Sequence, residues 1–374
     1  MSIVMTGGGT GGHLAIVRAV KEQLVNNADK RDQGAELRAY KEVSQSDTSQ
    51  NSSPFTLHSS LPTKLVYIGS TKGQDRQWFE DDVDFEAKYF LKTKGVVNQR
   101  GIGKLQALWM MFKAFLEARK LLKKHHAKVV FSVGGFSAAA TAFAAKSLGI
   151  PLVIHEQNAA QGSLNRLLKP FSAAFISSYL EESPIKAYPV KEVFFQNAHI
   201  RKKANTVIFL GGSQGARAIN ELALSIAPEL KERGIKIIHQ AGSNHIEEVE
   251  NTYKELGIEA EVFGFTTKLA DYMNEADFAI ARAGASTLWE LSAAALPTLF
   301  VPYPYAAGDH QYHNAKFLVD KELAWLMKEN EIGKEKVLAL LDENLEIKSR
   351  GLMEIVEKDG SREIALFLKA FTDK

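Results

Sequence analysis

The stretch Ser2-Ile3-Val4-Met5-Thr6-Gly7-Gly8-Gly9-Thr10-Gly11-Gly12-His13 joins a short apolar run to five glycines and a histidine. An apolar-periodic segment, residues 14–24, follows directly, so the pattern predicts a strand, a glycine turn and the start of a helix. The first amides of a helix favour an anion such as a phosphate, and glycine lets that anion approach the backbone closely. We therefore expect an anion site at this turn.

His13 is the titratable side chain at the rim of the turn. The helix dipole favours its neutral form, which can accept a proton at pH 7. Gly7, Gly9 and Gly12 also satisfy the G-x-G-x-x-G spacing of dinucleotide-binding loops, and a tight turn without a ligand is a third interpretation. The rest of the chain must decide between them.

The chain has 374 residues and no cysteine. This length favours two domains of similar size. The lack of thiols excludes a disulfide framework and a cysteine nucleophile, and it fits a reducing cytoplasm. We expect no signal peptide, because the N-terminus runs straight into the predicted strand, and no membrane span, because the uncharged run 129–145 is short and polar.

Charge divides unevenly along the chain. Residues 1–200 carry 25 Lys and Arg against 17 Asp and Glu, a net +8, whereas residues 201–374 carry 21 against 27, a net −6. A basic half suggests an anionic partner, either nucleic acid or an anionic membrane surface. The basic residues are not interleaved with aromatic residues as in single-strand binders, which argues against nucleic acid.

Residues 104–126 predict an amphipathic helix whose last turns are cationic. Its apolar stripe comprises Leu105, Leu108, Trp109, Phe112 and Leu116, and its basic end comprises Arg119, Lys120, Lys123 and Lys124. Two interpretations stay open: a core-facing helix with a cationic C-terminus, or a surface that binds an anionic membrane.

The pattern of a strand followed by two glycines recurs at 129–136 and 207–217, and further strands are expected at 64–69, 151–158, 276–281 and 299–302. Strands that alternate with helices predict an α/β protein with parallel sheets and ligands at the carboxyl ends of the strands. We expect domains at 1–198 and 199–355, and a last helix within 356–374 that packs back on the first domain. The polar segment 26–62 reads as a mobile insertion.

Two further segments, 82–84 and 286–290, each allow a functional and a purely structural interpretation. Asp82-Val83-Asp84 resembles the D-x-D of metal-dependent sugar transferases, but it lies in an acidic run that a solvated surface explains better. Ser286 and Thr287 can cap a helix whose amides take a diphosphate, and Glu290 can accept two ribose hydroxyls. An ordinary helix cap and a surface acid are the competing interpretations.

Five motifs in order carry a resemblance. They are 8–13, His155-Glu156-Gln157-Asn158, 211–217, Arg282-Ala283-Gly284-Ala285-Ser286-Thr287 and Asp309-His310-Gln311. Together they resemble the MurG family of glycosyltransferase family 28 over nearly the whole chain except 26–62. The resemblance implies a GT-B fold of two Rossmann-like domains facing a cleft. It also implies inverting transfer of N-acetylglucosamine from UDP to the 4-hydroxyl of lipid I, which forms lipid II for peptidoglycan.

The resemblance also implies roles for single residues. His13 matches the candidate base. The positions that match donor contacts are Thr10, Gly11, Gly12, Asn158, Arg201, Ser213, Thr266, Ala285, Ser286, Thr287, Leu288, Trp289, Glu290 and Gln311. It further implies no metal or other cofactor. UDP-N-acetylglucosamine, lipid I, an anionic membrane and other cell-wall synthesis proteins would be the partners, at the cytoplasmic face of the inner membrane.

This sequence departs from the family at Phe136, where Tyr is frequent, at Thr266, where an aliphatic residue is usual, and in the 26–62 insertion. Three other functions remain as alternatives. A nicotinamide oxidoreductase would need an acid at the end of the second strand, where 69–72 offers none. A serine hydrolase would use Ser213 with Asp309 and His310, and a binding module without catalysis is the third.

Overall fold

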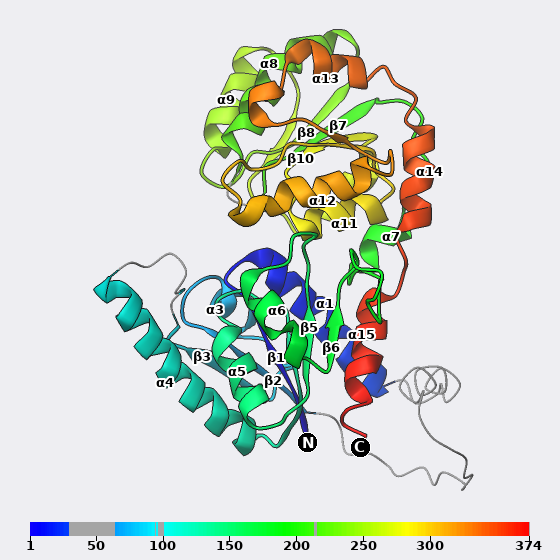
Figure 1. The fold of residues 1–374 in the computed structure, drawn as a ribbon. Helices are drawn as coiled ribbons and strands as arrows, with labels where there is room; N and C mark the ends of the chain where they lie inside the picture. Colours follow the sequence, from blue (N-terminus) through cyan, green and yellow to red (C-terminus); the bar gives the residue numbers. More distant parts are fainter. Residues whose placement is uncertain (30–63, 94, 96–100, 213–214, 374) are drawn as a thin grey trace, which may run out of the picture. The chain divides into compact units, whose positions relative to one another are not determined.

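The computed structural model describes residues 1–29, 64–93, 95, 101–212 and 215–373, which form two compact units (Figure 1). Unit 1 comprises Met1–Glu156, Gly162–Pro189 and Gly360–Lys374, and unit 2 comprises Gln157–Gln161 and Val190–Asp359. Each unit contains a six-stranded parallel sheet. The main segment of unit 2 thus begins at Val190, ahead of the boundary expected after residue 198, and unit 2 also includes Gln157–Gln161.

The sheet of unit 1 has the order β3-β2-β1-β4-β5-β6. Strand β1 is central: Val4 pairs with Val66 of β2 and with Val130 of β4, and every β1 residue is buried. Burial on both faces explains the unbroken apolar run in the sequence. The strands are β1 Ser2–Thr6, β2 Lys64–Ser70, β3 Ala87–Leu91, β4 Ala127–Ser132, β5 Leu152–His155 and β6 Ala174–Ile176.

The helices of unit 1 include α15, which the chain supplies after completing unit 2. Helix α15 packs against α1, and α4 packs against α5. The helices are α1 Gly11–Asp29, α3 Asp75–Phe79, α4 Ile102–Lys124, α5 Ala139–Ser147, α6 Ser163–Leu168, η1 Lys169–Phe171 and α15 Gly360–Lys369. Residues 26–29 are therefore helical rather than part of an insertion, and 30–62 lie outside the described residues.

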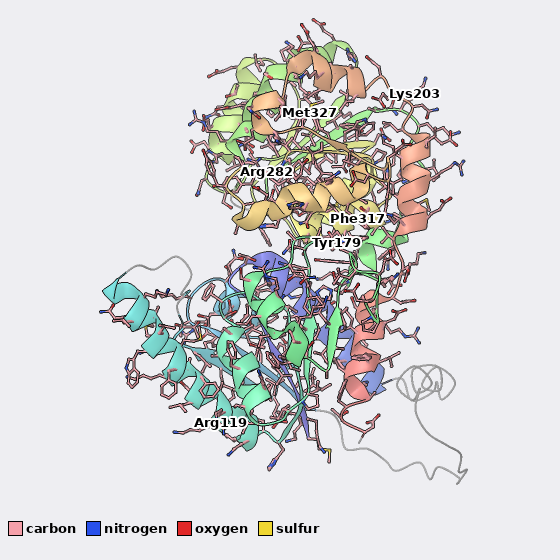
Figure 2. All side chains as sticks on the ribbon, viewed as in Figure 1. Arg119, Tyr179, Lys203, Arg282, Phe317 and Met327 are labelled. Carbon is pink, nitrogen blue, oxygen red and sulfur yellow. The ribbon has the colours of Figure 1, made fainter. Side chains whose placement is uncertain are left out.

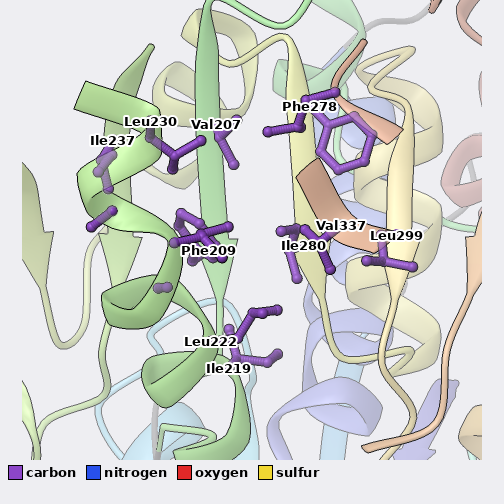
Figure 3. Packing of buried hydrophobic residues seen from close by; sticks show 14 of the residues in the cluster. Val207, Phe209, Ile219, Leu222, Leu230, Ile237, Phe278, Ile280, Leu299 and Val337 are labelled. Atoms are coloured by element: carbon purple, nitrogen blue, oxygen red, sulfur yellow. The ribbon is translucent and has the colours of Figure 1, made fainter. Parts of the chain in front are cut away.

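The sheet of unit 2 has the order β12-β11-β10-β7-β8-β9. Figure 3 shows its core, in which Phe209 and Ile280 from the central strands meet Ile219 and Leu222 of α8 and Val337 of α13. The strands are β7 Thr206–Leu210, β8 Lys236–Gln240, β9 Glu261–Phe263, β10 Phe278–Ala281, β11 Thr298–Phe300 and β12 Trp325–Leu326.

The helices of unit 2 follow its strands in the alternating order of a Rossmann-like sheet. They are α7 Val193–Gln196, α8 Arg217–Glu232, α9 Ile246–Glu255, α10 Leu269–Glu275, α11 Ala285–Ala293, η2 Ala307–Asp309, α12 His310–Val319, η3 Glu329–Glu331, α13 Lys334–Leu340 and α14 Glu346–Ile355. In the described part of the chain, no helix of either unit is long and apolar enough to cross a bilayer.

Candidate functional site

The glycine loop, residues 7–10, joins β1 to α1 at the carboxyl edge of the unit 1 sheet, and Gly11 and Gly12 are the first residues of α1. Its first three glycines are needed for packing. A Cβ on Gly7 would lie 2.3 Å from Val133, one on Gly8 would lie 2.6 Å from the Asp75 carboxylate, and one on Gly9 (φ 88°) would lie 2.7 Å from Phe136. Close packing of neighbouring loops, rather than approach of a ligand, therefore accounts for these three glycines.

Thr10 and His13 form a pair at the start of α1. The Thr10 Oγ1 atom lies 2.9 Å from His13 Nδ1. When Nδ1 carries the ring hydrogen and donates it to Thr10, the basic lone pair of the imidazole is on Nε2. In that tautomer His13 is suitable as a proton acceptor through Nε2.

His155 ends β5 and is fully buried in unit 1. Burial first, and the charge of His13 second, lower the pKa of His155 to about 3. Neither ring nitrogen of His155 has a hydrogen-bond partner among the described residues, and the ring lies edge-on to Tyr188 at 5.6 Å between centroids. His155 is therefore neutral near pH 7.

Glu156 follows β5 directly and organises the start of α6. Its Oε2 accepts hydrogen bonds from the backbone N–H of Gly162 at 2.8 Å and from Asn165 Nδ2 at 3.0 Å. The same Asn165 amide fills the space beside Gly134, where a Cβ would lie 2.8 Å from Asn165 Nδ2. These contacts join the loop after β5 to Gly134 and Gly135, the two glycines that follow β4.

Asn158, an expected donor contact, is held within unit 2 by Asn314 of α12. Asn314 Nδ2 donates to Asn158 Oδ1 at 3.1 Å and to the Ala283 carbonyl at 3.1 Å, and Asn314 Oδ1 accepts from Ala159 N–H at 2.8 Å. Asn314 is fully buried. The sequence alone did not identify it, because its partners are distant along the chain.

Helix α11 begins at Ala285, two residues earlier than a cap at Ser286 requires. Its N-cap is Gly284, so Ser286 and Thr287 lie in the first turn, and the expectation that they cap the helix is wrong. Ala285, Leu288 and Trp289 are buried in the same helix. Burial raises the pKa of the Glu290 carboxyl to about 7, against the opposing charge of Lys191.

Two other expected contacts of unit 2 are Thr266, in the loop after β9, and Gln311, in the first turn of α12. Gln311 Oε1 accepts from the Tyr303 N–H at 2.9 Å, and Thr266 Oγ1 accepts from the Lys268 N–H at 3.0 Å. Arg282, labelled in Figure 2, donates to the Val301 and Pro302 carbonyls and pairs with Glu329. Ser213 lies outside the described residues.

Arg201 is buried away from these loops. Its guanidinium donates to the carbonyls of Ala276 at 3.1 Å, His199 at 2.9 Å, Met273 at 3.1 Å and also Ala294. The carbonyls of Met273, Ala276 and Ala294 lie at the C-terminal ends of α10 and α11, ahead of β10 and β11, and that of His199 lies ahead of β7. Arg201 therefore lies at the amino edge of the sheet. Capping of two helix C-termini, rather than the implied donor contact, is the role that these contacts support.

The Asp82-Val83-Asp84 segment is engaged by a lysine of α1. The Lys21 Nζ atom lies 2.8 Å from Asp82 Oδ2 and 2.5 Å from Asp84 Oδ2. The side chain of Asp82 is only 12% exposed, so the expected solvated surface is wrong for this residue. Among the described residues, no group of three or more His, Cys, Asp or Glu side chains could hold a metal ion.

The apolar stripe of α4 faces outward. Leu105 is 68% exposed, Trp109 58% and Phe112 47%, while the buried face carries Ala114 and Ala118. The Trp109 and Phe112 rings stack with centroids 5.9 Å apart. A core-facing stripe, one of the two open interpretations, is therefore wrong.

His310, a partner in the hydrolase alternative, has Nδ1 2.9 Å from the Ala307 carbonyl oxygen. This contact takes up the ring nitrogen that an Asp would bind in a Ser-His-Asp triad. Asp309 precedes it in a left-handed conformation with φ 50°. The described part of this loop gives no support to a triad.

Comparison with known proteins matches both units. The model of the glycosyltransferase family 28 N-terminal domain matches residues 60–176, and that of the family 28 C-terminal domain matches residues 206–364. The chain is 68% identical over 371 residues to the UDP-N-acetylglucosamine--N-acetylmuramyl-(pentapeptide) pyrophosphoryl-undecaprenol N-acetylglucosamine transferase of Sulfurovum sp. (strain NBC37-1), and the match covers 99% of each chain. It is 50% identical to the protein of the same name from Sulfurimonas denitrificans, with 97% of each chain covered.

Among solved structures, the crystal structure of Acinetobacter baumannii MurG is similar, with a TM-score of 0.74, 24% identity and 99% of each chain covered. At this identity the likeness concerns the fold. It confirms the predicted α/β class and the GT-B fold, with two Rossmann-like parallel sheets.

Proposed function

The chain belongs to the family of UDP-N-acetylglucosamine--N-acetylmuramyl-(pentapeptide) pyrophosphoryl-undecaprenol N-acetylglucosamine transferases within glycosyltransferase family 28, and we propose that it catalyses the reaction named there. It transfers N-acetylglucosamine from UDP-N-acetylglucosamine to the 4-hydroxyl of lipid I, with inversion, and forms lipid II for peptidoglycan synthesis. The observation that carries this proposal is 68% identity over 99% of the chain to a relative of that name. The oxidoreductase, hydrolase and binding-module alternatives have no comparable support.

In the proposed reaction, the 4-hydroxyl oxygen of the acceptor attacks C1 of N-acetylglucosamine as the bond from C1 to the diphosphate oxygen breaks. His13 takes the hydroxyl proton on Nε2, while Nδ1–H donates to Thr10 at 2.9 Å. A positioned base contributes roughly 10²–10⁴-fold. Helix-end amides, such as those at the start of α11, stabilise the charge of the departing UDP without a metal ion.

The donor residues remain a proposal in two groups. Thr10, Gly11 and Gly12 in unit 1 are assigned to the donor on family grounds alone. Asn158 follows β5 of the unit 1 sheet and is bound by Asn314 of α12. The other unit 2 residues have independent support, because they follow strands of the unit 2 sheet at its carboxyl edge: Thr266, Ala285, Ser286, Thr287, Leu288, Trp289, Glu290 and Gln311. No cofactor is proposed, and we expect full activity in the presence of EDTA.

The test is UDP release from UDP-N-acetylglucosamine with and without a short-chain lipid I analogue. UDP release that depends on the analogue supports the proposal. Tight UDP binding without such release would contradict lipid I as the acceptor. His13→Ala should lower turnover about 10²-fold or more with donor affinity little changed, because a base acts only in the transition state. Near-normal turnover in a stably folded His13→Ala protein would remove His13 from this role.

We also propose that α4 binds an anionic membrane, as a peripheral enzyme at the cytoplasmic face with a lipid-linked acceptor requires. The exposed Trp109 and Phe112 have Lys113 beside them, with Nζ 5.2 Å from the Trp109 ring. Apolar side chains that insert among headgroups, together with cations that face anionic lipid, are typical of such surfaces.

The membrane proposal is tested by sedimentation with phosphatidylglycerol-containing vesicles. Trp109→Ser with Phe112→Ser should weaken binding. The matched control is Leu256→Ser with Met353→Ser, since these unit 2 side chains are similarly exposed, at 42% and 46%. Equal binding by both double variants would place the membrane surface elsewhere.

A further inference from the structure

Asp75 begins α3 and lies fully buried beneath the glycine loop. Its Oδ2 accepts from the Gly9 N–H at 2.8 Å, and its Oδ1 accepts from the Ser70 N–H at 2.9 Å and lies 3.1 Å from the Tyr67 hydroxyl. No Lys, Arg or His of the described residues forms an ion pair with it. A carboxylate accepts hydrogen bonds and donates none, which suits a site with two backbone N–H donors and a tyrosine hydroxyl whose single hydrogen is shared with the Gly7 carbonyl.

The same contacts lock two loops together. The Tyr67 hydroxyl donates to the Gly7 carbonyl at 2.8 Å, and a Cβ on Gly73 would lie 2.6 Å from the Gly9 Cα. A Cβ on Gly8 would meet the Asp75 carboxylate at 2.6 Å. The loop after β2 therefore fixes the path of the loop after β1 on both sides of Gly9.

Gly9 leads directly into the pair formed by Thr10 and His13. A shift at the Gly9 amide moves the Thr10 hydroxyl and changes its contact with His13 Nδ1, now 2.9 Å. Misplacing a reacting group by about 1 Å can cost roughly 10²-fold in rate. The chain of contacts thus runs from a buried carboxylate to the candidate base without a gap.

We propose that Asp75 is a positioning residue for His13, acting through the Gly9 amide and Thr10, and this inference rests on the proposed transferase function. Asp75 touches neither substrate. It sets where the imidazole lies and keeps Nδ1 as the nitrogen that donates to Thr10. An Asn in its place would turn an NH2 group toward one of the N–H donors, which breaks one of the two backbone contacts.

The test compares Asp75→Asn, His13→Ala and the double variant. We expect Asp75→Asn to lower kcat about 10-fold or more and the double variant to match His13→Ala within about twofold, because residues that act through one group are non-additive. Asp82→Asn is the matched control. It also removes a carboxylate charge that is only 12% exposed, but one bound to Lys21 further along α1, and it should leave kcat unchanged. A double variant whose losses multiply would overturn the proposal, as would Asp75→Asn at the wild-type rate.

A second readout does not need activity. Nitrogen-15 NMR of the imidazoles, with the His13 signals assigned from their loss in His13→Ala, should show hydrogen on Nδ1 in the wild type and a mixture of both tautomers in Asp75→Asn. Unchanged tautomers would overturn the inference even if the transferase function holds, whereas absent UDP release by the wild type would count against the function alone. If Asp75→Asn does not fold, Tyr67→Phe, which releases the Gly7 carbonyl, should produce a smaller shift in the same direction.

Discussion

The Glu290 carboxyl is buried and is also proposed to bind the ribose hydroxyls of the donor. Its pKa of about 7 in the folded protein lies above its ordinary 4.5, so the unfolded chain gives up the proton first as pH rises. The contribution of Glu290 to stability is therefore present below about pH 4.5 and is lost as pH rises through 7. We expect Glu290→Gln to raise the melting temperature relative to the wild type at pH 8 and to do so much less at pH 5. A constant difference between the two proteins across this range would contradict it.

Binding of the donor should depend on Glu290 in the opposite sense. The ionised carboxylate accepts hydrogen bonds from two ribose hydroxyls, whereas the protonated form uses one oxygen to donate. UDP affinity of the wild type is expected to increase from pH 6 to pH 8, as measured by calorimetry. Glu290→Ala should weaken UDP binding and abolish this dependence; unaltered affinity would remove Glu290 from the donor site.

Substitution of Arg201 tests whether this residue stabilises the fold or contacts the donor. Arg201→Met leaves several buried carbonyls without a donor, so we expect it to lower the free energy of unfolding by about 2–4 kcal/mol. UDP affinity of the folded protein should stay near the wild-type value. Lys202→Met is the control, because this neighbouring side chain is 70% exposed. Lost affinity with intact stability would restore the donor contact that the family resemblance implies.

Helix α15 illustrates how one element completes a unit built from distant segments. Ile364 is fully buried on it, and a Cβ at its first residue, Gly360, would meet the Ala187 carbonyl at 2.5 Å. Ile364→Ala should destabilise unit 1 by about 2–5 kcal/mol. Ile347→Ala in α14 makes the same change at a side chain that is 77% exposed, and it should stay within about 0.5 kcal/mol. Hydrogen exchange should become faster for the α1 amides of Ile364→Ala and stay unchanged for those of α8 in unit 2; equal acceleration in both helices would contradict a loss confined to unit 1.

The same scale shows what the sequence could predict. Apolar runs that end in glycine turns identified strands and following helices, as at 207–217, which became β7 and the start of α8. The α4 stripe was correct as a pattern but ambiguous in direction, because helical periodicity defines a face without saying what covers it. The sequence did not identify Asp75 or Asn314, since the contacts that link them to the candidate site, with Gly9 and Ala159, span 66 and 155 positions and no local pattern marks such contacts.

At the scale of the whole molecule, the two halves of the sequence carry opposite net charges, +8 in residues 1–200 and −6 in residues 201–374. If the basic half faces anionic lipid, raising the salt from about 0.05 to about 0.5 M should weaken vesicle binding by screening. Lys120, Lys123 and Lys124 changed together to Glu should weaken it further, since each cation near the surface is worth about 1 kcal/mol. Binding that is insensitive to salt would mean that apolar insertion alone holds the protein.

The return of the chain to unit 1 at Gly360 also fixes an order of events during synthesis. Residues 190–359 leave the ribosome before α15 does, so unit 2 can close its own sheet while α1 still lacks its packing partner. Unit 1, whose first strands are synthesised first, is therefore the last unit to be completed. A chain that stops before residue 360 would contain all of unit 2 but would leave an apolar face of α1 uncovered in unit 1. Unit 1 can therefore complete its packing only after α15 has been synthesised.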